Sequence, residues 1–126
     1  MMTGQPIPDD VRRFLLARHL TVPHVEAILL MRREPEPPWD AARLAARLYV
    51  ALQVATSVLA DLAGISLVEK TDAGFRYAPA DAPTQALIAR LEEVYAKNLV
   101  EVARLIHSTR DRSAEEFAAA FRFRKE

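Results

Sequence analysis

The stretch 39–78 contains the pattern that most restricts what this chain can fold into. After Asp40, apolar residues recur with a helical period, stop near Ala51, and recur again until Gly64. Two short runs of β-prone residues follow, and Asp72-Ala73-Gly74 separates them. This order predicts a helix, a tight turn, a second helix and an antiparallel hairpin.

Local signals set the expected boundaries of these elements. Asp40 is suited to capping the first helix, and Gly64 is suited to ending the second in a left-handed conformation. The hairpin strands are predicted at 67–71 and 75–78, and Trp39 is expected to anchor the preceding connector against the core. The periodicity of the second helix predicts an inward face made of Val54, Val58, Leu59 and Leu62.

The flanking segments are predicted to be helical. Residues 8–34 should form two N-terminal helices, the second of which ends before Pro35, because three prolines make the sequence EPEPPWD non-helical. Residues 82–107 contain no glycine and no proline beyond the first turn, so we expect one helix of about 25 residues. A final helix is expected after a capping box of Ser113 and Glu116.

A homodimer follows as an expectation from that long helix. About 25 residues exceed what a small core can cover, and Ile88, Leu99 and Val100 widen its apolar face. The C-terminal helices 82–126 are therefore predicted to meet a second copy.

The bulk composition limits the classes of protein and partner. The chain has 126 residues, no cysteine, and 17 basic against 17 acidic side chains. This length fits a single domain, and the absence of cysteine excludes a disulfide framework and a thiolate nucleophile. The sequence shows neither a secretory signal nor a long apolar run, so we expect a cytoplasmic protein without a membrane partner. A neutral chain has no overall attraction to nucleic acid.

The runs LAARLYV and ALQVATSVLADLAG resemble the helix-turn-helix of MarR-type and other bacterial winged-helix regulators, over about 40 residues. More loosely, IPDDVRRFLL, VPHVEAILLMRREP, YAKNLVEVARLIHS and FAAAFRFRKE look like a set of small, mostly uncharacterised bacterial winged-helix proteins. The resemblance implies a mostly α fold with a small β-hairpin wing, in a single domain 1–126 with the helix-turn-helix and wing at 39–80.

By analogy with such regulators, the chain is expected to bind double-stranded DNA and regulate transcription. The candidate residues for base edges are Gln53, Thr56 and Ser57, and those for phosphates are Arg43, Arg47, Lys70 and Arg76. The sequence departs from the usual pattern because the second helix has no Lys or Arg, and Ala51 stands where a capping Ser or Thr is common.

Other interpretations stay open beside DNA binding. Because residues 39–80 hold four acids and four bases, the motif also suits a winged helix that binds a protein. An effector cavity is a further possibility, and its candidate residues are Trp39, Tyr49, Tyr77 and Tyr95. The phenylalanines Phe117, Phe121 and Phe123 share helical spacing typical of a core or dimer interface, and a basic tail follows.

Nothing in the sequence indicates an enzyme, a metal site or a cofactor. His19, His24 and His107 lack the helical i, i+4 placement of zinc hydrolases. With three glycines in total, the chain has little room for a phosphate-binding loop.

Overall fold

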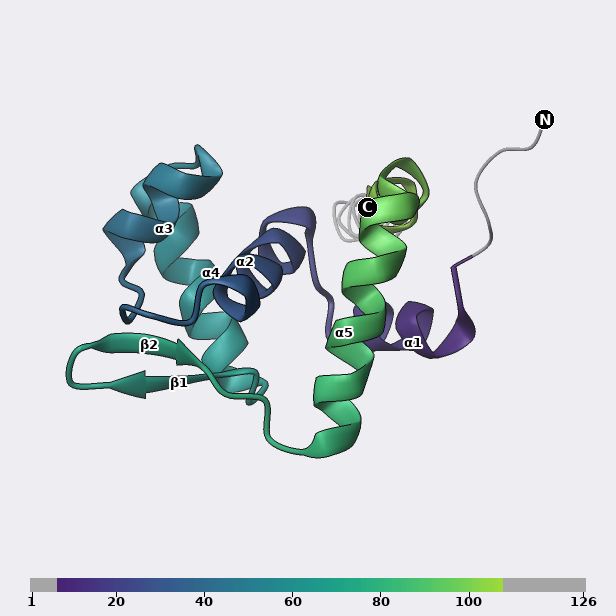
Figure 1. Cartoon of the computed structure of the whole chain (residues 1–126). Coiled ribbons are helices and arrows are strands. Elements are labelled where there is room, and N and C mark those ends of the chain that lie inside the picture. The colour runs from purple at the N-terminus through teal and green to yellow at the C-terminus, as the bar shows by residue number, and fades with distance from the viewer. Residues whose placement is uncertain (1–6, 108–126) are drawn as a thin grey trace, which may run out of the picture.

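A computed structural model describes residues 7–107 of the chain (Figure 1). This part is mostly helical and contains one two-stranded antiparallel sheet. Its elements are α1 (Asp9–Ala17), α2 (Val22–Arg33), α3 (Ala41–Leu48), α4 (Leu52–Gly64), β1 (Val68–Thr71), β2 (Gly74–Tyr77) and α5 (Ala82–Lys97), and a further helical segment covers 99–107. The expected final helix after Ser113 lies outside the described residues.

Helix α2 is the centre of the molecule. It lies between the unit of α3, α4 and the hairpin on one side and the helices α1 and α5 on the other (Figure 1). Apolar residues surround it on most sides, and the most buried are Val25, Ala27, Ile28, Leu29 and Met31. Thr21 caps this helix and Arg33 is its last residue, which confirms the predicted end before Pro35.

Helices α3 and α4 are joined by a three-residue turn and meet at 113°. The Oδ1 atom of Asp40 accepts a hydrogen bond from the backbone N–H of Arg43 at 2.8 Å, which confirms the predicted cap. Tyr49 ends α3 with a left-handed φ of 58°, and Ala51 precedes the first turn of α4. The predicted turn near Ala51 is therefore confirmed.

The predicted left-handed role of Gly64 is wrong. Gly64 is still the last residue of α4, and Ser66 takes the left-handed conformation, with φ 63°. The N–H of Ser66 donates to the oxygen of Ala63, and that of Leu67 donates to the oxygen of Leu62. These two bonds form a Schellman motif whose left-handed residue lies two residues later than the glycine placement suggests.

The predicted inward position of Val54 is also wrong. Helix α4 buries Ala55, Val58, Leu59 and Leu62, which recur at i, i+3, i+4 and i+7. Val54 precedes Ala55 by one residue, so it lies about 100° from Ala55, at the edge of this stripe, and is 39% exposed. A small alanine, rather than a valine, begins the buried face.

The hairpin forms as predicted, with boundaries shifted by one residue. Strand β1 pairs with β2 from Val68 opposite Tyr77 to Thr71 opposite Gly74. Trp39 forms an isolated antiparallel bridge to β2, since its backbone N–H donates to the oxygen of Phe75 at 2.8 Å and its oxygen accepts from the N–H of Phe75 at 2.7 Å. The Trp39 side chain is fully buried, so its predicted anchoring role is confirmed.

The long helix predicted for 82–107 is wrong. Helix α5 ends at Lys97, and Asn98 leaves the helical conformation with φ −131° before helix resumes at 99. Asparagine is a weak helix former because its side chain competes for backbone hydrogen bonds. The break allows Val102 and Ile106 to be buried in the same core as Ile88. The length of the helix therefore no longer supports a dimer, and Ile88 is not exposed for contact with a second copy.

Within residues 7–107, no single helix has both the length and the apolar character to span a bilayer. Two strongly bent pairs, α1 with α2 and α3 with α4, satisfy those criteria only when taken together.

Candidate binding surfaces

The guanidinium of Arg43, a predicted phosphate contact, is bound to the connector before α3. Its Nη1 donates to the carbonyl oxygen of Pro37 at 2.6 Å, and its Cζ lies 3.6 Å from the centre of the Trp39 ring. Stacking on a tryptophan face stabilises a cation, particularly an arginine. The structure therefore uses Arg43 to hold the connector over Trp39.

Arg47, one turn later on α3, is also occupied. Its two terminal nitrogens donate to both carboxylate oxygens of Glu34, at 2.8 and 2.7 Å. This bidentate hydrogen bond holds the pKa of Glu34 below its ordinary value and raises the pKa of Arg47. Sequence analysis missed Glu34 because it treated EPEPPWD only as a connector.

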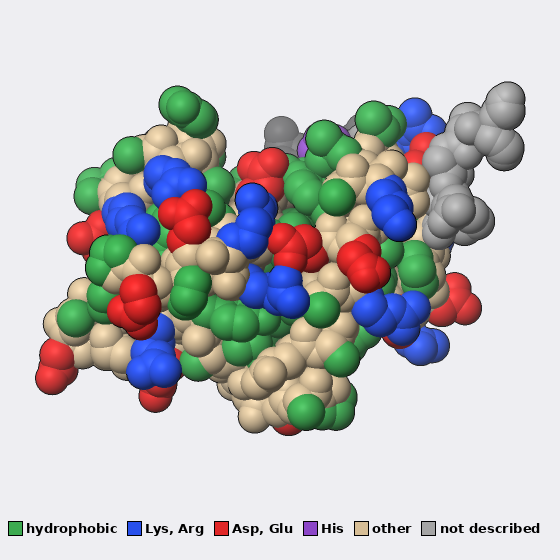
Figure 2. Space-filling view, in the orientation of Figure 1, with side chains coloured by type: hydrophobic (Ala, Val, Ile, Leu, Met, Phe, Trp, Pro, Cys, Tyr) green, Lys and Arg blue, Asp and Glu red, His purple; other side chains and the backbone are tan. Residues whose placement is uncertain are grey.

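The hairpin carries the two other predicted phosphate contacts. Arg76 lies opposite Glu69 across the strands, with its Nε atom 3.9 Å from the Glu69 carboxylate. Lys70 is exposed, and no ion pair joins it to another described residue. Figure 2 shows basic and acidic side chains interleaved on the face of the molecule that it presents, without a continuous basic stripe.

The outward surface of α4 carries no positive charge. We call this surface the α4 face and define it by five exposed residues: Leu52, Gln53, Val54, Thr56 and Ser57. It includes all three predicted base contacts, but Leu52 is 58% exposed beside them. The Thr56 hydroxyl already donates to the carbonyl oxygen of Leu52 at 2.9 Å, so towards a partner it offers only acceptor capacity.

Asp61, the single charged residue of α4, is fixed by α2. Its Oδ2 accepts from Nε2 of His24 at 2.9 Å. The Nδ1 atom of the same ring accepts from the backbone N–H of Thr21 at 3.0 Å, which leaves the proton on Nε2. His24 therefore joins the start of α2 to α4 and is used structurally.

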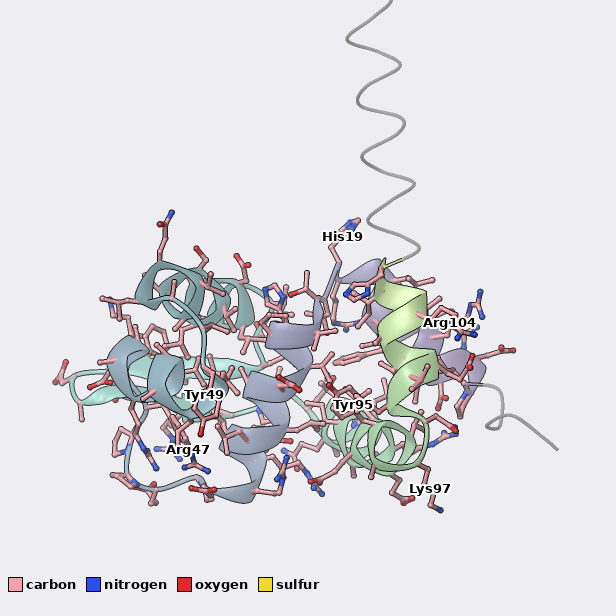
Figure 3. The ribbon with its side chains drawn as sticks, turned by 90° about the horizontal axis from the view of Figure 1, so that it is seen from above. His19, Arg47, Tyr49, Tyr95, Lys97 and Arg104 are labelled. Atoms are coloured by element: carbon pink, nitrogen blue, oxygen red, sulfur yellow. The ribbon has the colours of Figure 1, made fainter. Side chains whose placement is uncertain are left out.

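A groove of about 330 Å³ lies along the exposed side of α2. We call it the α2 groove. Its residues are Glu26, Leu29, Leu30 and Arg33 of α2, Arg47, Leu48 and Tyr49 at the end of α3, and Tyr95 of α5. Figure 3 shows Tyr49 and Tyr95 on opposite sides of α2, with Arg47 near Tyr49.

The two tyrosines of this groove differ in their contacts. The Tyr95 hydroxyl donates to Oε2 of Glu26 at 3.0 Å, and burial together with this carboxylate raises the pKa of Tyr95. Tyr49 is 94% exposed on the rim. The structure thus brings together two of the four aromatic residues predicted for a cavity, while Trp39 and Tyr77 lie elsewhere.

Sequence analysis did not identify the α2 contribution to this groove. Its four members, Glu26, Leu29, Leu30 and Arg33, recur at spacings of three and four, which places them on one helix face. That mixed polar and apolar stripe was a readable signal. It was hidden because the other faces of α2 are apolar too.

Among residues 7–107, no group of three or more His, Asp or Glu side chains is arranged to hold a metal ion. No protein-family model matches the chain, and neither a curated protein nor a solved structure matches it significantly. The geometry described above is therefore the basis for a functional assignment.

Proposed function

We propose that the chain is a winged helix-turn-helix protein whose α4 face binds another protein. The observation that carries this proposal is the composition of that face. Leu52 and Val54 are exposed there, and no lysine or arginine accompanies them. Protein interfaces combine an apolar centre with a polar rim and are depleted of charge at the centre.

The assignment of a winged helix-turn-helix is supported by the arrangement of residues 39–77. Helices of such motifs cross at about 90–120°, and α3 and α4 meet at 113°. A hairpin follows α4 directly, and Trp39 pairs with its second strand. The order of the elements, the crossing angle and the bridge from Trp39 to Phe75 all agree with this fold.

A protein partner fits this surface better than a DNA backbone does. Affinity for DNA comes largely from basic side chains that neutralise phosphates. Arg43 and Arg47 are engaged with the connector, and Arg76 lies opposite Glu69. A DNA complex would have to break the first two sets of contacts before either arginine reached a phosphate.

The test is site-specific photocrosslinking in cells that produce the full chain. A photoreactive phenylalanine analogue at Val54 is expected to give a discrete protein adduct, and the same analogue at Ala86, which is exposed on α5, is expected to give none. Adding Leu52→Asp should abolish the adduct without unfolding the chain, because the side chain is already exposed. Equal adducts at both positions, or none at Val54, would contradict the proposal.

Direct DNA binding is the second candidate function. Exposed Gln53 and Ser57 on α4, together with Lys70, which is exposed on the hairpin and makes no ion pair within residues 7–107, favour it. The affinity for genomic DNA fragments should then fall steeply as the salt concentration rises. Lys70→Glu should reduce the slope of this salt dependence by the amount expected for about one phosphate contact. Weak binding that is independent of salt and of Lys70 would exclude this function.

The expected homodimer stays a prediction that sedimentation of the full chain can check.

A further inference from the structure

The Asp61 carboxylate is held in place by a group that carries no charge. Its Oδ2 accepts a hydrogen bond from Nε2 of His24 at 2.9 Å, and the two side chains are 61% and 11% exposed, respectively. The Nδ1 atom of His24 accepts from the Thr21 N–H, so the ring holds one proton and is neutral. The contact with His24 therefore fixes the direction of the carboxylate but leaves its negative charge uncompensated.

Within the described part of the chain, no cation compensates this charge. Among residues 7–107, Asp61 forms no ion pair with a lysine or an arginine, whereas Asp10, Glu34 and Glu92 each pair with an arginine. An ionised carboxylate has about four acceptor positions, and His24 uses one of those on Asp61. Asp61 thus keeps the capacity to bind a cation that another molecule presents.

Asp61 lies at one end of the α4 face. Val54, Ser57 and Asp61 recur at i, i+3 and i+7, which places them on one side of the helix. Asp61 lies about 10 Å along the axis from Val54. The exposed residues between the two ends include the small Ser57 and Ala60. Helix α4 therefore presents an apolar end, a middle that carries small side chains, and an anionic end.

We infer that the α4 face binds an amphipathic helix of another protein, whose apolar residues cover Leu52 and Val54 and whose lysine or arginine pairs with Asp61. This inference rests on the proposed function and names the chemistry of the partner. Because both helices rise about 1.5 Å per residue, a partner helix laid along α4 spans from Val54 to Asp61 with about seven residues. The small side chains of Ser57 and Ala60 allow the two axes to approach to the roughly 8–10 Å of ordinary helix packing.

The charge of Asp61 selects the partner more than it strengthens the complex. Charged groups at the edge of an interface contribute mainly to specificity and to the rate of association. A partner with an acidic residue at this place would meet a like charge, and so would the phosphates of DNA. The apolar contacts at Leu52 and Val54 supply the binding free energy, while Asp61 sets the direction in which the helix lies.

The test uses the full chain with the photoreactive phenylalanine analogue at Val54 and adds charge variants to it. Asp61→Asn removes the charge and keeps an oxygen that can accept from His24, so it should preserve the fold and lower the adduct yield roughly fivefold. The control Asp72→Asn removes the same charge from the exposed hairpin turn and should leave the yield unchanged. In cell extracts, added salt should lower the yield of the parent chain and change that of Asp61→Asn little.

The outcomes separate this inference from the proposed function. An adduct at Val54 whose yield depends on neither Asp61 nor salt would overturn the inference and leave the proposed function standing. A missing adduct in every variant would contradict both, and so would an adduct that joins Val54 to a segment of this chain itself.

The captured residues provide a second measurement. Mass spectrometry identifies the partner residues that are captured from Val54 and, in a second chain, from the same analogue at Ala60. A helical partner places these two residues about six positions apart and an extended partner about three, because a strand rises about 3.3 Å per residue. A lysine or arginine is expected within one helical turn of the residue captured from Ala60. An extended spacing, or a captured segment without either cation at that place, would overturn the inference.

Discussion

The outward side chains of α3 and α4 differ in their contacts with the rest of the chain. On α3, Arg43 and Arg47 are bound to Pro37, Trp39 and Glu34 of the preceding connector. On α4, the five residues of the α4 face are uncharged, and the one charged residue of the helix, Asp61, is bound to His24 of α2. The comparison teaches that the two arginines of α3 hold the connector to the motif, whereas the α4 face is left exposed and without charge.

The largest expected effect is the difference in lost stability between a substitution beneath the arginines of α3 and a substitution on the α4 face. Trp39→Ala removes a fully buried ring on which the Arg43 guanidinium stacks. It also removes the hydrogen bond that the indole N–H donates to the backbone carbonyl oxygen of Glu34 at 2.9 Å. We expect a loss of about 3–5 kcal/mol in the free energy of unfolding. The matched change on α4, Leu52→Ala, should stay within about 0.5 kcal/mol because Leu52 is exposed. Urea unfolding measures both, and similar losses would break the comparison.

A smaller effect is expected where the hairpin meets the connector. Gly74 has φ 138°, and a Cβ atom there would lie 2.6 Å from the Trp39 oxygen. Gly74→Ala should therefore cost about 1–3 kcal/mol of unfolding free energy. In contrast, a Cβ atom at Gly64, the last residue of α4, would meet nothing within 4 Å, so Gly64→Ala should stabilise the protein by about 0.5–1 kcal/mol. Thermal unfolding of the two variants should shift in opposite directions, and a shift in the same direction would count against this account.

The smallest effect concerns acid and sharpens the description of α3. Hydrogen bonding to Arg47 lowers the pKa of Glu34 in the folded state, so its contribution to stability is present at neutral pH and disappears as the pH falls through that lowered pKa. Glu34→Gln should flatten the acid side of the stability profile slightly, since the pair is exposed to solvent. The neighbouring exposed carboxylate offers a control in Glu36→Gln. The midpoint of urea unfolding, measured as the pH is lowered, checks this. Identical profiles for wild type and Glu34→Gln would show that the contact between Arg47 and Glu34 does not stabilise the fold.

The elements of the motif could be predicted because their signals are local. Asp40 caps α3 through a bond three residues away, and Asp72-Ala73-Gly74 marks the hairpin turn. The errors arose where one signal was read alone. Gly64 was preferred as the left-handed residue although Ser66 takes that role, and the valine at 54 was placed inside although Ala55 sets the buried face.

The candidate surfaces could not be predicted in the same way because their contacts join distant residues. Glu34 and Arg47 are 13 residues apart, and Glu26 and Tyr95 are 69 apart. The seven residues predicted to contact DNA were found from their types and spacing, which say nothing of intramolecular partners. The break at Asn98 was missed for a related reason, since packing of Val102 and Ile106 on the core favours a bend that periodicity alone does not reveal.

The pair of backbone hydrogen bonds between Trp39 and Phe75 has a mechanical consequence. They clamp the hairpin close to its turn, at Phe75, to a connector that is itself tied to the end of α2, so the hairpin cannot swing as an independent arm. Any molecule that touches its tip meets a preoriented support. Little configurational freedom then remains to be lost on association, and even a small contact area there contributes effectively to affinity.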